Sequence, residues 1–100
     1  MNINFEYHNV SASPRLEDFV TEKLNKLEEK YDFIVNADVY IKKENTSGGD
    51  TGRICNIRLD APGPTLFAEA SNGSFEASVA KAVSELKIQL QKRKDKMKTH

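Results

Sequence analysis

The side chains with the clearest chemistry are the basic residues near the C-terminal end. Six of the last fourteen residues are Lys or Arg, namely Lys87, Lys92, Arg93, Lys94, Lys96 and Lys98. The whole chain has 15 bases, 15 acids and no formal net charge, but residues 1–80 carry 8 bases against 13 acids, and residues 81–100 carry 7 against 2. Such a concentration of positive charge predicts a polyanion-binding end. The alternative is a solvated helix C-terminus, which also favours lysine.

Catalytic and metal-binding chemistry has few candidates. His8 and His100 lie far apart, and neither has a neighbouring Ser or Cys that it could activate. Cys55 falls on the inward side of a predicted strand, where a thiol acts as a small apolar group. One Cys and two separated His do not make a zinc pattern, and Gly48-Gly49 lacks the spacing of a phosphate-binding loop. We expect the acids of the first helix to be solvated; these are Glu17, Asp18, Glu22, Glu28 and Glu29. The sequence therefore predicts a protein without enzymatic activity, cofactor, metal or small-molecule substrate.

The size and composition predict one domain, residues 1–100. Hydrophobic residues make up 38% and charged residues 30%, as in ordinary globular domains. A single cysteine, Cys55, cannot form an internal disulfide, and no stretch is typical of a signal peptide or a membrane span. We therefore expect a cytoplasmic protein with no membrane partner.

Periodic apolar residues predict six elements that position these bases. Alternating residues predict strands within 3–8, 34–44, 52–61 and 65–71, with Val35, Ala37, Val39 and Ile41 inward in the second. Helical spacing predicts helices from about Pro14 to Lys30 and from about Ser74 to the mid-90s, with Ser13 and Ser74 as N-caps. Pro62-Gly63-Pro64 predicts a hairpin connection.

This order predicts an α+β fold, a two-layer β-α-β-β-β-α sandwich with a four-stranded mixed sheet. The first strand-helix-strand crossover makes its two strands parallel if they are adjacent, and the hairpins make the rest antiparallel. Both helices carry one apolar stripe, so we expect both on one sheet face, leaving the other face to solvent or a partner.

The two helices could join their lysines into one basic surface. The first helix contributes Lys23, Lys26 and Lys30. The second has one flank with Lys87, Lys94 and Lys98 and another with Lys81, Lys92 and Lys96. Lysines bind phosphates without reading bases, which suits structured RNA, and the strands lack the aromatic pattern of single-strand readers.

The chain resembles the short ribosome hibernation-promoting factors, a family that includes ribosome-associated inhibitor A and is also called the sigma-54 modulation protein family. The resemblance covers essentially the whole length. It rests on FVTEKLNKLEEKYD, residues 19–32, and more specifically on AVSELKIQLQKRKDKMKTH, residues 82–100. It implies a fold similar to a double-stranded-RNA-binding domain.

The resemblance also implies a function. Such a protein would bind the small ribosomal subunit in the mRNA and tRNA channel and reversibly inhibit translation in stationary phase or stress. It carries over Lys23, Lys26, Lys87, Lys92, Lys94, Lys96 and Lys98. Lys30 and Lys81 come from the helix flanks and Arg93 from the basic C-terminal end. The expected rRNA-binding set is therefore Lys23, Lys26, Lys30, Lys81, Lys87, Lys92, Arg93, Lys94, Lys96 and Lys98.

Two features differ from the family pattern. Ser74 and Glu76 stand where family members commonly have Asp and Tyr, and an acid there would disfavour RNA at the helix start. We expect neither the C-terminal dimerisation domain nor the acidic tail that some relatives carry, and we expect a monomer when free. The alternative function is a protein-interaction module that regulates a transcription or signalling partner through its basic C-terminal helix.

Overall fold

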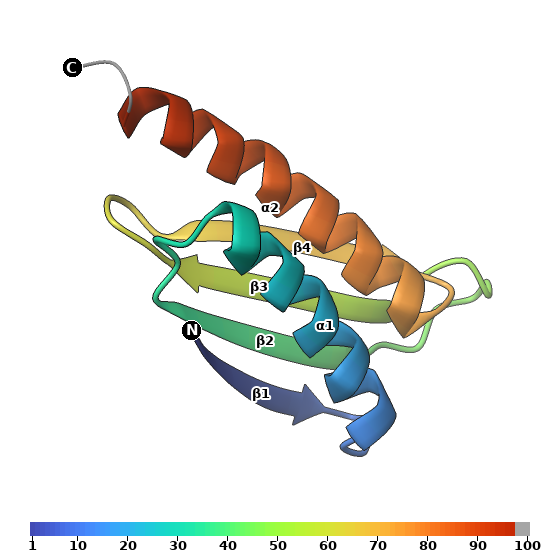
Figure 1. The fold of residues 1–100 in the computed structure, drawn as a ribbon. Helices are drawn as coiled ribbons and strands as arrows, with labels where there is room; N and C mark the ends of the chain where they lie inside the picture. The colour runs from blue at the N-terminus through green and yellow to red at the C-terminus, as the bar shows by residue number, and fades with distance from the viewer. Residues whose placement is uncertain (98–100) are drawn as a thin grey trace.

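The predicted order of elements is confirmed in a computed structural model, which describes residues 1–97. The elements are β1 (Asn2–His8), α1 (Pro14–Lys30), β2 (Asn36–Lys43), β3 (Arg53–Asp60), β4 (Leu66–Asn72) and α2 (Phe75–Met97). They form the predicted two-layer α+β sandwich, in which α1 and α2 lie side by side across one face of the sheet (Figure 1). The likeness to a double-stranded-RNA-binding domain stays a prediction.

The sheet has the strand order β1-β2-β3-β4. β1 and β2 are parallel, because the chain crosses over through α1 between them, while β2-β3 and β3-β4 are antiparallel hairpins. The connection that closes the second hairpin contains Gly63 at φ 98°, a left-handed conformation that glycine adopts without steric cost. The mixed sheet was predicted from the order of elements alone.

The core lies between the helices and the covered face of the sheet. Side chains from both layers are fully buried there: Val20, Leu24, Ala37, Ile41, Cys55, Ile57, Leu59, Val79, Ala82, Leu86 and Leu90. These are the positions that the 3.6-residue and two-residue periods assign to the inward faces. The predicted inward position of Cys55 is confirmed, and its burial raises the pKa of the thiol to about 12.

Serine side chains fix the start of each helix. Ser13 Oγ accepts the Leu16 backbone N–H at 3.2 Å, and Ser74 Oγ accepts the Ala77 N–H at 3.1 Å, so both predicted caps are confirmed. The buried Ser78 adds a third restraint, because its hydroxyl contacts the carbonyl oxygens of Arg53 and Ser74. The start of α2 is thereby held against β3.

Val35 does not belong to the core, contrary to the prediction. Its side chain is 62% exposed, whereas that of Ile34 is 4% exposed. β2 begins only at Asn36, so the alternation that predicted Val35 as inward has not yet started at that residue. In the connection from α1 to β2, Ile34 takes the buried place instead.

Two acids of α1 are not simply solvated, contrary to the prediction. Glu17 Oε2 accepts the Tyr7 hydroxyl at 2.6 Å, and Glu28 Oε2 lies 2.7 Å from the Met1 amine. The pKa of Tyr7 is raised mainly by burial and to a smaller extent by the hydrogen bond to Glu17. These two carboxylates tie β1 to α1, while Asp18, Glu22 and Glu29 are exposed as predicted.

Candidate nucleic-acid interface

A groove of about 320 Å³ runs between α1 and α2 and is lined by lysines from both helices. Lys23, Lys26 and Lys30 come from α1, where spacings of three and four residues place them on one face. Lys87 comes from α2. The other lining residues are small, apolar or aromatic and include no acid: Leu27, Tyr31, Ala80, Val83 and Ser84. The groove is therefore positively charged, because none of its lining residues carries a negative charge that would neutralise the lysines.

Lys94 extends this group at the C-terminal end of α1. Its Nζ donates to the Lys30 backbone oxygen at 3.3 Å, at a helix end where carbonyl groups lack partners. The Nζ atoms of Lys30 and Lys94 lie 5.5 Å and 5.6 Å from the centroid of the Tyr31 ring. Because Tyr31 is buried and donates to Gln91 Oε1 at 2.7 Å, it gives both ammonium groups a fixed support.

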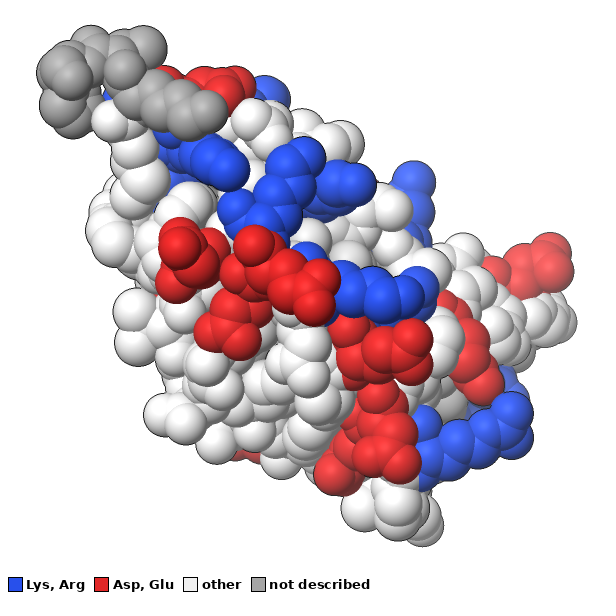
Figure 2. Space-filling model, viewed as in Figure 1, with Lys and Arg blue, Asp and Glu red and all other residues white. Residues whose placement is uncertain are grey.

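We name Lys23, Lys26, Lys30, Lys87 and Lys94 the interhelical lysine cluster. Figure 2 shows blue Lys and Arg gathered where α2 approaches the C-terminal half of α1, with red Asp and Glu along α1 beside them. The two kinds of charge meet at an exposed pair between Lys26 and Glu22, whose atoms lie 3.5 Å apart. Such a pair contributes little, so the ammonium group stays available to a ligand.

Three other predicted site residues, Lys81, Lys92 and Lys96, do not line the groove. Lys81 and Lys92 are exposed and lie about 120–140° round α2 from Lys87. Lys96 is also exposed and lies one turn beyond Lys92. Lys98 is outside the described residues, as is His100.

Arg93 has a different setting from the lysines around it. Its guanidinium donates to the Pro62 oxygen at 2.7 Å and to the Pro64 oxygen at 2.8 Å. It thereby holds the β3-β4 connection against α2. Two of its donors are already engaged within the protein, which sequence reasoning missed because the partners are 29 and 31 residues away.

Tyr31 is the second feature that sequence reasoning missed. Its position continues the helical spacing of the apolar residues Leu24 and Leu27, and the residue is buried. Its role in supporting Lys30 and Lys94 depends on how α2 crosses α1, which the sequence does not give directly. The sequence signal that could have indicated this role is the aromatic Tyr31 directly after Lys30 at the predicted helix C-terminus.

The described residues offer little else for chemistry. Within residues 1–97, no three His, Cys, Asp or Glu side chains come together in a way that could hold a metal ion. Burial raises the pKa of the Cys55 thiol, which disfavours the thiolate, the nucleophilic form. No helix in the described part of the chain is long and apolar enough to cross a membrane.

The fold and the cluster together define an α+β protein with a lysine-lined surface suited to a polyanion. The chain belongs to the family described as "Sigma 54 modulation protein / S30EA ribosomal protein", which it matches over residues 3–98. It is 33% identical over 100 residues to the ribosome hibernation promoting factor of Klebsiella oxytoca, with all of both chains covered. The family predicted from residues 19–32 and 82–100 is thus confirmed.

Solved structures agree with this assignment at the level of the fold. One is described as a ribosomal subunit interface protein from Coxiella burnetii; it has a TM-score of 0.81 at 24% identity, over 95% of this chain and 99% of that one. Another is the N-terminal domain of Protein Y from Thermus thermophilus, with a TM-score of 0.75 at 25% identity, over 92% of this chain and 98% of that one.

Proposed function

We propose that this protein is a ribosome hibernation factor that reversibly inhibits translation by binding rRNA of the small subunit in the mRNA and tRNA channel, in stationary phase or under stress. The observation that carries the proposal is the groove between α1 and α2, which has lysines on both sides and no acid among its lining residues. The full-length similarity to a ribosome hibernation promoting factor supports the same role.

The interhelical lysine cluster would bind phosphates of the RNA backbone. An ammonium group is a compact point charge with three donors, which suits phosphate oxygens and carries no base specificity. Recognition would depend on whether the folded RNA brings its phosphates to the groove, so structured RNA is the expected ligand. Once bound, the protein would block the channel by occupying it, without any covalent step.

The remaining predicted residues take secondary roles in this proposal. Lys81, Lys92, Lys96 and Lys98 would make peripheral contacts, since those among them that the structure describes do not line the groove. Arg93 would act mainly by holding the β3-β4 connection that it already contacts. The proposal assigns RNA binding to residues 1–100 as one cytoplasmic domain that is monomeric when free and needs no cofactor.

Co-sedimentation with purified small subunits tests the proposal directly. The protein should sediment with small subunits at low salt and dissociate steeply between about 50 and 200 mM salt, as expected for phosphate contacts. Total cell protein freed of ribosomes serves as the competitor. Preferential capture by an acidic protein from that mixture, with no binding to small subunits, would favour the protein-interaction alternative instead.

A further inference from the structure

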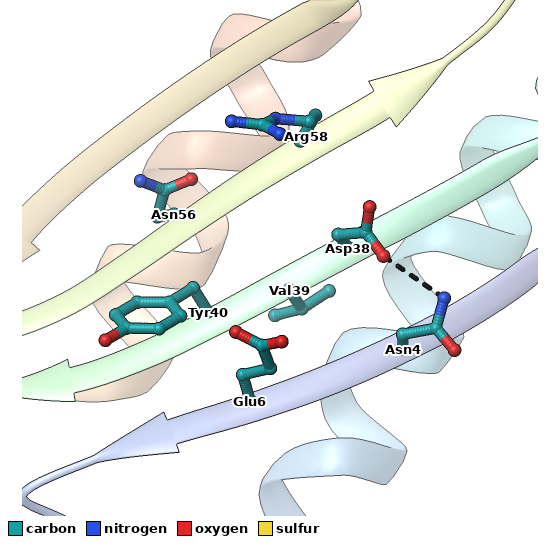
Figure 3. A pocket seen from close by; sticks show the side chains of 7 residues that line it. All are labelled: Asn4, Glu6, Asp38, Val39, Tyr40, Asn56 and Arg58. Atoms are coloured by element: carbon teal, nitrogen blue, oxygen red, sulfur yellow. Dashed lines mark hydrogen bonds between the residues drawn. The ribbon is translucent and has the colours of Figure 1, made fainter.

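The face of the sheet opposite the helices is hollowed and polar. A depression of about 430 Å³ is lined by Asn4, Glu6, Asp38, Val39, Tyr40, Asn56 and Arg58, which come from three strands (Figure 3). Both helices lie on the other side of the sheet, so no element of residues 1–97 covers this face. It is distinct from the interhelical lysine cluster.

Three carboxylates form a diagonal line across this open face. In the strand register, Asp60 of β3 is opposite Asn36, Asp38 of β2 is opposite Asn4, and Tyr40 is opposite Glu6 of β1. Each step from Asp60 to Asp38 and from Asp38 to Glu6 therefore moves one strand across and two residues along. Diagonal neighbours of this kind are about 7–8 Å apart.

Neutral amides orient two of these carboxylates. Asn4 Nδ2 donates to Asp38 Oδ1 at 3.1 Å, and Asn36 Nδ2 donates to Asp60 Oδ2 at 3.4 Å. An amide fixes the position of a carboxylate without cancelling its charge. Within the described residues, none of the three carboxylates forms an ion pair, whereas Glu22, Glu28 and Glu44 each do.

From this geometry we infer that the open face binds an extended polypeptide segment with Lys or Arg at every second position. Side chains that point to one side of an extended chain are about 6.6–6.8 Å apart. This spacing is slightly shorter than the roughly 7–8 Å between diagonal neighbours in a sheet, and the long side chains of Lys and Arg can span the difference. Charge complementarity selects a basic segment, and RNA is disfavoured because its phosphates would meet the same carboxylates. The half-buried Tyr40 gives the segment an aromatic surface beside the line.

Arg58 provides an internal check on this inference. It is exposed and lies opposite Asp38 in the register of β2 and β3, and its guanidinium points away from the Asp38 carboxylate (Figure 3). It is therefore a positive charge beside the line of carboxylates, where it repels a basic segment. Removing it and removing a carboxylate should change the affinity in opposite directions.

The test is an NMR titration of the ¹⁵N-labelled full chain with two capped heptapeptides of the same composition. One alternates Thr and Lys, and the other has its three Lys side by side. The alternating peptide should shift the backbone amides of β1, β2 and β3 near Asp38 and bind at least about threefold more tightly. Equal affinity of the two peptides, or shifts confined to α1 beside Glu22 and Glu29, would overturn the inference.

Variants of the same chain sharpen the test. Asp38→Asn and Glu6→Gln should each weaken binding about two- to fivefold, the range of one exposed ion pair. Arg58→Ala should strengthen it about twofold, the effect of removing a like charge ~8 Å away in water. Asp38→Asn keeps an oxygen acceptor for Asn4, so the fold should be retained; no loss of affinity in this variant would contradict the inference.

This inference stands apart from the proposed function. Lys87→Ala should leave binding of the alternating peptide unchanged, because Lys87 lines the groove on the opposite side of the sheet. Asp38→Asn should likewise leave the affinity for protein-free rRNA of the small subunit unchanged. If both surfaces bind their ligands, the protein would join an RNA backbone on its helical face to a basic polypeptide on its open sheet face.

Discussion

Replacing Lys87 and Lys94 together by Ala should separate binding by the groove from binding by overall charge. Lys87 lines the groove from α2, and Lys94 completes the cluster beside Lys30 and Tyr31. Both lie off the buried stripe of α2, and alanine favours helix, so the double variant should fold. The loss of the contacts between Lys94, Lys30 and Tyr31 should cost stability by no more than about 1 kcal/mol.

The size of the effect follows from the number of phosphate contacts. If each of the five lysines of the cluster neutralises one phosphate, the logarithm of the affinity should fall with the logarithm of salt at a slope of about −4, taking ~0.7–0.9 per contact. Removing two contacts should reduce the slope to about −2.4. At about 1 kcal/mol for each contact, the pair contributes ~2 kcal/mol, which corresponds to about 30-fold weaker binding at low salt.

The matched control is the double change of Lys81 and Lys92 to Ala, which removes the same charge from the other flank of the same helix. Binding to small subunits, measured by co-sedimentation or fluorescence anisotropy over a salt series, should weaken by less than about threefold in this control. Circular dichroism and thermal unfolding verify that both variants fold. Equal weakening by the two double variants would refute RNA binding through the groove, because overall charge alone would then explain the affinity. If the change of Lys87 and Lys94 to Ala did not weaken binding, the same hypothesis would be refuted.

Three further predictions concern other parts of the molecule. Arg93→Ala should lower the free energy of unfolding by about 1 kcal/mol through loss of its hydrogen bonds to Pro62 and Pro64, and urea unfolding should show no such change if those bonds are unimportant. Burial raises the pKa of the Cys55 thiol from 9.0 to about 12, so its contribution to stability is complete below pH 9.0 and is lost as the pH rises toward about 12. Relative to Cys55→Ala, the wild type should therefore lose roughly 1 kcal/mol for each pH unit between about 9 and 12. Parallel stability curves of the two proteins would contradict this. Ribosomes exposed to the protein and then washed in high salt should regain full translation activity in vitro, since lysine-phosphate contacts leave no covalent change, and persistent loss of activity or cleaved rRNA would indicate catalysis.

The elements and their pairing could be predicted because their signals are local. The stripe that contains Val20 and Leu24 has the helical period, and the alternation around Ile57 has the strand period, so each element reveals its inward face independently. A helix that crosses over between β1 and β2 then makes the two strands parallel if they are adjacent, as they are in the sheet. The lysines of the cluster could be found for the same reason, since Lys23, Lys26 and Lys30 share one side of a helix.

Details that depend on distant partners could not be predicted in this way. Arg93 contacts Pro62 across 31 residues, and Glu28 contacts the Met1 amine across 27. Neither contact leaves a periodic signal, so both residues were assigned from their own helix alone. Val35 shows the same limit at a strand end: the alternation extends through it in the sequence, but the strand starts one residue later, and Ile34 is buried instead.

The separation of charge between surfaces explains how a chain with no net charge could bind two ligands of opposite sign. At physiological ionic strength, exposed charges are screened over about 8 Å. The principal dimensions of the molecule are 50, 24 and 19 Å, so even the shortest is more than twice that length. An RNA backbone at the interhelical lysine cluster would therefore respond to nearby ammonium groups, with little effect from Asp38 and Glu6 on the far side of the sheet. By the same reasoning, charges added to the open face should change the affinity for the basic peptide and leave the salt dependence of small-subunit binding unaltered. A change in both quantities would mean that the two surfaces are electrostatically coupled.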